Sequence, residues 1–172
     1  MRSSLGLTAP GPRSFFVACT TATPAIAPLR LTPIEVSGSG ADDHAAGSSG
    51  LAGVHTQVLS GDPSKPGFYT ILLFVPAGTT IQAHSHRDNR MATVVSGTWN
   101  FGYGDRFQES ALKALPPGSV YSEPGGKTHF ARTAAEPVVV ELSGSGPTDT
   151  VYFDAANDPS QHRQQAALQA RD

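Results

Sequence analysis

Three histidines stand in two short stretches of the sequence that could together build one metal site. A single residue separates His84 from His86, and residues two apart on a β-strand point to the same face. His129 comes after the tight turn Pro124-Gly125-Gly126, at the start of another predicted strand. Two imidazoles on one face and a third from a second strand form a facial set of ligands for a divalent cation. These three histidines are therefore candidate metal ligands, although His84 and His86 taken alone fit an ordinary surface or core pair equally well.

Glycines and a proline stand at regular distances from these histidines. Five residues separate Gly78 from His84, and Gly97 ends the strand that follows. In the second stretch, five residues separate Gly118 from Pro124, and Gly126 and His129 follow. In order and spacing, the two stretches resemble the two motifs of the cupin superfamily. The strand 97–104, Gly-Thr-Trp-Asn-Phe-Gly-Tyr-Gly, is similar to that of bacterial single-domain cupins.

The resemblance implies an all-β fold, the double-stranded β-helix or jelly-roll barrel, with metal ligands at His84, His86 and His129. It also implies a glutamate ligand that six residues separate from Gly97, but Arg90 occupies that position. A guanidinium can neither ligate a metal nor lose its proton at ordinary pH. Arg90 is therefore the point at which this chain departs from the family pattern.

Three outcomes are open for this position. Arg90 could turn away and leave a three-histidine site, as in cupin dioxygenases where an arginine holds the substrate carboxylate. Alternatively, an oxygen ligand could complete the site, the candidates being Gln82, Asp88 and Glu123. In the third case the site has lost its metal and the cavity binds an anion. The retained histidines favour the first outcome.

The elements that must position these residues are short strands. The chain has 172 residues, enough for one domain with a core, and its 18 glycines and 14 prolines are typical of an all-β protein with many turns. The strands expected from β-rich runs between turn signals are 54–59, 68–75, 79–84, 91–95, 98–103, 120–122, 128–133, 137–142 and 151–153.

Outside the barrel, assigned to 53–154, the sequence predicts little packed structure. Residues 1–30 are predicted to be a disordered leader or a degraded export signal. Residues 31–52 are predicted to be an edge strand, Leu31–Val36, followed by a flexible Gly- and Ser-rich linker. Residues 155–172 form a polar tail in which Asp158-Pro159-Ser160 could begin a helix.

Composition narrows the range of partners. A net charge of −2 provides no basic face for nucleic acid, and no apolar run is long enough to span a membrane. Cys19 is the only cysteine, so any metal depends on nitrogen and oxygen ligands. The chain is predicted to be soluble, either cytoplasmic or exported to the periplasm, and to pair with itself, because an edge strand would otherwise stay unpaired.

The leading functional hypothesis is a metal-dependent enzyme of the dioxygenase, isomerase or lyase type. It would act on a small organic substrate, including an anionic one, with Fe, Mn, Ni or Zn as the metal. Arg90 would position a carboxylate or enolate, and Gln82 and Tyr121 would hydrogen-bond to the metal-bound group. The alternative is a non-catalytic cupin that binds or senses a small molecule. The barrel itself does not decide between them.

Overall fold

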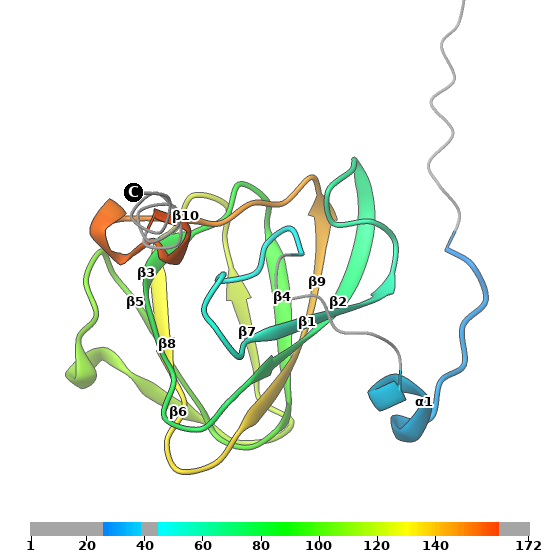
Figure 1. Ribbon diagram of the computed structural model, residues 1–172, viewed down its shortest axis with the longest axis horizontal. Coiled ribbons are helices and arrows are strands. Elements are labelled where there is room, and N and C mark those ends of the chain that lie inside the picture. The colour runs from blue at the N-terminus through cyan, green and yellow to red at the C-terminus, as the bar shows by residue number, and fades with distance from the viewer. Residues whose placement is uncertain (1–25, 39–44, 162–172) are drawn as a thin grey trace, which may run out of the picture.

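The computed structural model describes residues 26–38 and 45–161, and within them two five-stranded antiparallel sheets face each other (Figure 1). One sheet has the strand order β1-β2-β9-β4-β7 and the other has the order β10-β3-β8-β5-β6. The strands are β1 (His55–Ser60), β2 (Gly67–Val75), β3 (Thr80–Ser85), β4 (Arg90–Ser96), β5 (Trp99–Tyr103), β6 (Lys113–Leu115), β7 (Val120–Glu123), β8 (His129–Arg132), β9 (Val138–Gly146) and β10 (Val151–Tyr152). Two short 3₁₀ helices, η1 (Glu109–Ala111) and η2 (Ala155–Asn157), complete the barrel region. The all-β prediction is confirmed.

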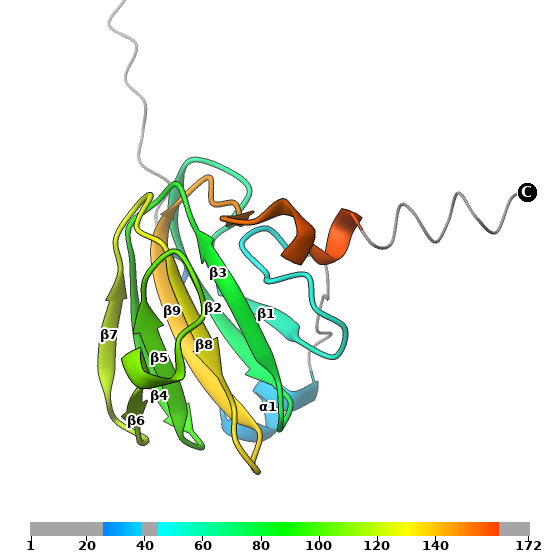
Figure 2. The same ribbon diagram turned by 90° about the vertical axis from the view of Figure 1, so that its left-hand side faces the viewer.

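The core lies between the two sheets. In the side view, the sheet that contains β3, β8 and β5 lies in front of the other sheet (Figure 2). Alternate residues of the long strands β2 and β9, which pair along their whole length, point inward and are buried. The inner side chains include Ile71, Val94, Trp99, Val140 and Leu142. This alternation is expected of strands with one face on a core and one face toward solvent.

Each of the strands predicted from 54 to 153 corresponds to an observed one, within a few residues at its ends. The added strand is β6, Lys113–Leu115, which pairs with β5 at the edge of its sheet. Its sequence has no β-branched or aromatic residue, so pairing with β5 and not local preference makes it a strand.

The edge strand predicted for Leu31–Val36 is wrong, because Pro33–Gly38 form a short helix, α1. The Thr32 backbone N–H and hydroxyl donate to a carboxylate oxygen of Glu35, 2.7 and 2.6 Å away, and the Glu35 N–H donates to the Thr32 hydroxyl. This is a capping box, and Pro33 stands at the first helical position, where proline is favoured. The argument for self-pairing that depended on this edge therefore no longer holds, and self-pairing stays a prediction.

Part of the predicted linker instead packs against the barrel. In the described portion, residues 45–53, the side chains of Ser48 and Ser49 are buried. The Tyr152 hydroxyl donates a hydrogen bond of 2.7 Å to the Ser49 carbonyl oxygen. A Cβ on Gly47 would lie only 2.7 Å from a Thr148 methyl group. The loop 45–50 therefore fits closely against the segment before β10, with small residues allowing the approach.

Residues 1–25 of the predicted leader or export signal, with Cys19, lie outside the described residues, as does most of the polar tail. The predicted helix start is present: residues 159–161 are helical, and the Asp158 carboxylate accepts a hydrogen bond from the Ser160 N–H at 2.8 Å. Among the helices of the described residues, none is long and apolar enough to cross a membrane.

Gly97, between β4 and β5, provides a test of how tightly the turns are constrained. It has a positive φ of 71°, and an added Cβ would lie 2.3 Å from the Pro137 carbonyl oxygen. Gly118 also has a positive φ, of 85°, but its Cβ would meet nothing within 4 Å. We expect Gly118→Ala to cost about 1–2 kcal/mol of stability for its conformation, and Gly97→Ala about 1–3 kcal/mol more for the overlap. Urea unfolding of both variants tests this, and equal losses would contradict it.

Candidate metal centre

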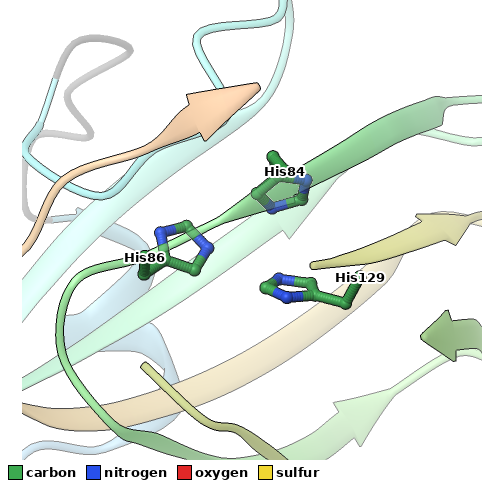
Figure 3. A group of neighbouring side chains, drawn as sticks. All are labelled: His84, His86 and His129. Atoms are coloured by element: carbon green, nitrogen blue, oxygen red, sulfur yellow. The ribbon is translucent and has the colours of Figure 1, made fainter. Parts of the chain in front are cut away.

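The three predicted histidines converge inside the barrel (Figure 3). His84 lies near the end of β3, His86 directly follows that strand, and His129 is the first residue of β8. β3 and β8 pair so that His84 and His129 stand opposite each other. Each side chain offers one ligand atom within 4.8 Å of the others, and all three side chains are buried. Two motifs far apart in sequence thus meet through a strand pairing.

Backbone carbonyl groups orient each imidazole ring. The Nδ1 atom of His84 lies 2.7 Å from the Gln82 carbonyl oxygen, and that of His129 lies 3.1 Å from the Lys127 carbonyl oxygen. His86 Nδ1 contacts the Asp149 carbonyl oxygen. Because a carbonyl oxygen only accepts, Nδ1 must carry the proton, which leaves each Nε2 with a free lone pair.

The Nε2 atoms of His86 and His129 are buried and have no hydrogen-bond partner among the described residues. Buried polar atoms without partners are uncommon and call for an explanation. A cation bound to these lone pairs would provide one, and carbonyl groups on the opposite ring nitrogen are the usual outer support of metal-binding histidines. The residues present therefore fit a divalent metal.

Burial keeps the rings in the neutral form that binds metal. Burial, with a smaller effect of His129, lowers the pKa of His84 to about 3. The pKa values of His86 and His129 also fall, again mainly because burial disfavours the charged imidazolium. Metal binding at neutral pH therefore does not have to displace protons from these rings.

Gln82 does not lie where strand alternation suggested. The pairing of β3 with β8 shifts register between Ile81 and His84, as at a β-bulge. Ile81, three residues before His84, lines the cavity beside the histidines, whereas Gln82 lines a separate depression together with Asp105 and others. Gln82 supports the site through its carbonyl group and not through its side chain.

Arg90 faces the barrel interior, where it forms an ion pair. Its Nε donates a hydrogen bond of 2.6 Å to Oε2 of Glu123, and its Nη2 contacts the same oxygen. Its Nη1 lies 3.3 Å from the Gly47 carbonyl oxygen. Arg90 and Glu123 are directly opposite on the neighbouring strands β4 and β7, and both are buried. The guanidinium therefore holds a carboxylate of the protein itself.

Glu123 also lies beside the histidines. Its Oε2 is 3.7 Å from His86 Nε2, and its Oε1 is 3.7 Å from His129 Nε2. Burial has the largest single effect and would raise the pKa of Glu123, but Arg90 and the three histidines together outweigh it and the pKa falls to about 2. The carboxylate is therefore ionised at neutral pH.

Two buried tyrosines lie near the ion pair of Arg90 and Glu123. Tyr121, on β7, is buried, and burial together with the Glu123 charge raises the pKa of its phenol well above the usual value, so it stays protonated. The Tyr69 hydroxyl donates a hydrogen bond of 2.6 Å to the buried Asp88 carboxylate. Burial and this bond raise the pKa of Tyr69 to about 12.

The cavity between these groups is small, about 20 Å³. Space of this size holds about one water molecule or ion. Its lining includes His84, His129, Arg90, Glu123, Tyr121, Trp99, Phe101, Gly47 and Ser49. Trp99 and Phe101 of β5 thus form part of the cavity wall, whereas Tyr103, the third aromatic residue of that strand, is exposed. Gly47 and Ser49 of the loop 45–50 also form part of this wall.

Comparison with known proteins supports the fold. No protein-family model and no curated protein matches the sequence. Among solved structures, the polyketide cyclase RemF from Streptomyces resistomycificus matches with a TM-score of 0.59 and 14% identity, over 78% of this chain and 94% of that one. An RmlC-like cupin from Shewanella frigidimarina matches with a TM-score of 0.48 and 17% identity, over 63% and 85%.

The DMSP lyase DddQ from Ruegeria pomeroyi matches with a TM-score of 0.45 and 19% identity, over 54% of this chain, which spans only 47% of that protein. Identities this low bear on the fold and not on the activity. The paired antiparallel sheets carry the histidines of both motifs into one barrel. The fold of this chain is that of a double-stranded β-helix, with two five-stranded antiparallel sheets facing each other, and it is similar to the fold of RemF.

Proposed function

We propose that this protein binds a divalent metal through His84, His86 and His129 and is a metal-dependent enzyme acting on a small organic substrate. The observation that carries the proposal is the convergence of three neutral imidazoles, two of whose Nε2 atoms are buried and find no hydrogen-bond partner within residues 26–38 and 45–161. Fe, Mn, Ni and Zn all accept imidazole ligands. When bound, such an ion would act as a Lewis acid that polarises a coordinated oxygen.

The surrounding charges favour an anionic substrate group. Arg90 and Glu123 neutralise each other, so a bound dication would remain largely uncompensated within the cavity. Burying net charge is costly, and an anionic ligand would reduce that cost. Tyr121, protonated and buried beside Glu123, could donate a hydrogen bond to such a group. In this proposal Arg90 supports Glu123 instead of holding the substrate directly.

The second candidate is a non-catalytic cupin that binds or senses a small ligand. The small closed cavity favours it, because the described conformation has room for an ion or a water molecule but not for an organic substrate. A redox-active metal at an exchangeable coordination position would favour the enzyme. Protein that is metal-free as isolated and binds small anions tightly would favour the binder.

The decisive test is elemental analysis of protein purified without chelator and without a nickel column. We expect close to one equivalent of a transition metal or zinc in the wild type, and His84→Ala should lose most of it because one of three ligands is removed. His55→Ala is the matched control, since His55 lies on β1 outside the cluster. Metal-free wild-type protein that also fails to take up added Zn²⁺, Ni²⁺, Mn²⁺ and Fe²⁺ would refute the proposal.

A further inference from the structure

We propose that Glu123 is the carboxylate ligand of this metal centre and that Arg90 is the residue that positions it. The inference depends on the proposed metal site and adds to it a fourth ligand from a different strand. In the cupin pattern the glutamate stands at the place of Arg90, on β4. Here the carboxylate would come from β7, directly across the sheet from that place.

The position of the carboxylate between two imidazoles is the first support. Its two oxygens lie 3.7 Å from the Nε2 atoms of His86 and His129. Two ligands that are each about 2.0–2.2 Å from one ion lie roughly 3.0–3.5 Å apart. Each of the two Glu123–histidine separations is therefore only slightly longer than the distance between two ligands of one ion.

The protons provide the second support. Because the Nδ1 atoms of His86 and His129 are held by carbonyl oxygens, their Nε2 atoms carry lone pairs toward Glu123 and donate no hydrogen bond to it. Lone pairs of two imidazoles and a carboxylate thus face one another in a buried place. An ion pair with a purely structural role would not need this arrangement, but a cation between the three groups would satisfy all of them.

Arg90 fixes which oxygen is available. Its Nε and Nη2 both contact Oε2 of Glu123, and its Nη1 is held by the Gly47 carbonyl oxygen. The guanidinium thereby sets the orientation of the carboxylate and leaves Oε1 directed toward His129. Since Arg90 itself would not touch the ion, it is a positioning residue. Compared with the family pattern, the carboxylate thus stands on β7 and not on β4.

The test compares metal binding among variants of the full chain, using Zn²⁺ in competition with a chelator and Co²⁺ as a spectroscopic probe. Glu123→Gln should weaken Zn²⁺ binding by at least about 10-fold, the lower limit usual even for outer-shell partners, and should change the Co²⁺ absorption bands because the ligand set changes. Arg90→Glu combined with Glu123→Arg returns a carboxylate to β4 and should restore affinity to within a few-fold of the wild type. Glu109→Gln is the control, because it breaks the surface pair with Arg132 without touching the cavity.

If Glu123→Gln does not fold, Arg90→Met with Glu123→Gln removes both charges together and replaces it in the comparison. Wild-type protein that binds metal, together with a Glu123 variant of unchanged affinity and unchanged Co²⁺ spectrum, would overturn the ligand assignment and leave the three-histidine site intact. Wild-type protein that binds no metal would refute the proposed function itself, together with this inference.

Discussion

Replacing Arg90 by Met is expected to lower the free energy of unfolding of the metal-free protein by about 3–5 kcal/mol, the loss typical of a broken buried ion pair. The variant leaves the Glu123 carboxyl group buried without the cation that lowers its pKa, so its ionised form is no longer compensated. The Gly47 carbonyl oxygen also loses its partner, so the loop 45–50 should be held less firmly. Urea unfolding in the presence of EDTA measures the change.

The matched control for Arg90→Met is Arg132→Met, which removes the cation from an exposed pair with Glu109. An exposed ion pair contributes about 1 kcal/mol or less, so the two arginine variants should differ clearly. Arg90→Met with Glu123→Gln should recover part of the lost stability, because no unpaired charge remains buried. Arg90→Met and Arg132→Met with the same unfolding midpoint would contradict this account of Arg90.

Adding a divalent metal is expected to stabilise the wild-type protein by about 4 kcal/mol when the free ion is at 1,000 times its dissociation constant. The ion binds the three histidines only when the barrel holds β3 and β8 together, so binding favours the folded state. His84→Ala should show little of this stabilisation, whereas His55→Ala should retain it. Thermal unfolding with and without the metal, reversed by EDTA, provides the measurement.

The same titration separates the roles of Arg90 and the histidines. Arg90→Met should gain more stability from the metal than the wild type does, because the ion then takes over the charge of Glu123 and no longer meets the guanidinium. The variant whose metal-free form is less stable is therefore expected to show the larger stabilisation by the metal. An equal gain in wild type, Arg90→Met and His84→Ala would mean that the ion binds elsewhere, and would contradict the site.

The barrel and its histidines could be predicted from the sequence because their signals are local. Strand runs between Gly and Pro turns identify most of the strands, and the single-residue spacing of His84 and His86 already indicates a shared face. The spacing of glycines in the two motifs resembles a known pattern, which added His129 to the pair. These features depend on neighbours in the chain, and each can be seen without knowing which strands pair.

Local signals were misleading at Gln82 and at the two segments before the barrel. A register shift between Ile81 and His84 reverses the alternation that would have placed Gln82 beside the histidines. The Thr32–Glu35 capping box made a helix where apolar residues suggested a strand. The Gly- and Ser-rich loop 45–50 has a composition typical of a linker, yet contacts with Arg90 and Tyr152 hold it over the cavity.

The sequence by itself thus determined the fold class, the three imidazoles and the break in the family pattern at Arg90. Only the tertiary structure decided that Arg90 pairs with a carboxylate of the protein itself. Alternation along 120–123 left Glu123 free to face either the lumen or water, because nothing local fixes the register of β7 against β4. The cross-strand pairing sets Glu123 opposite Arg90 and beside two histidines. A buried charge needs an opposite charge close to it in space, and the partner of Arg90 on β4 is Glu123 on β7.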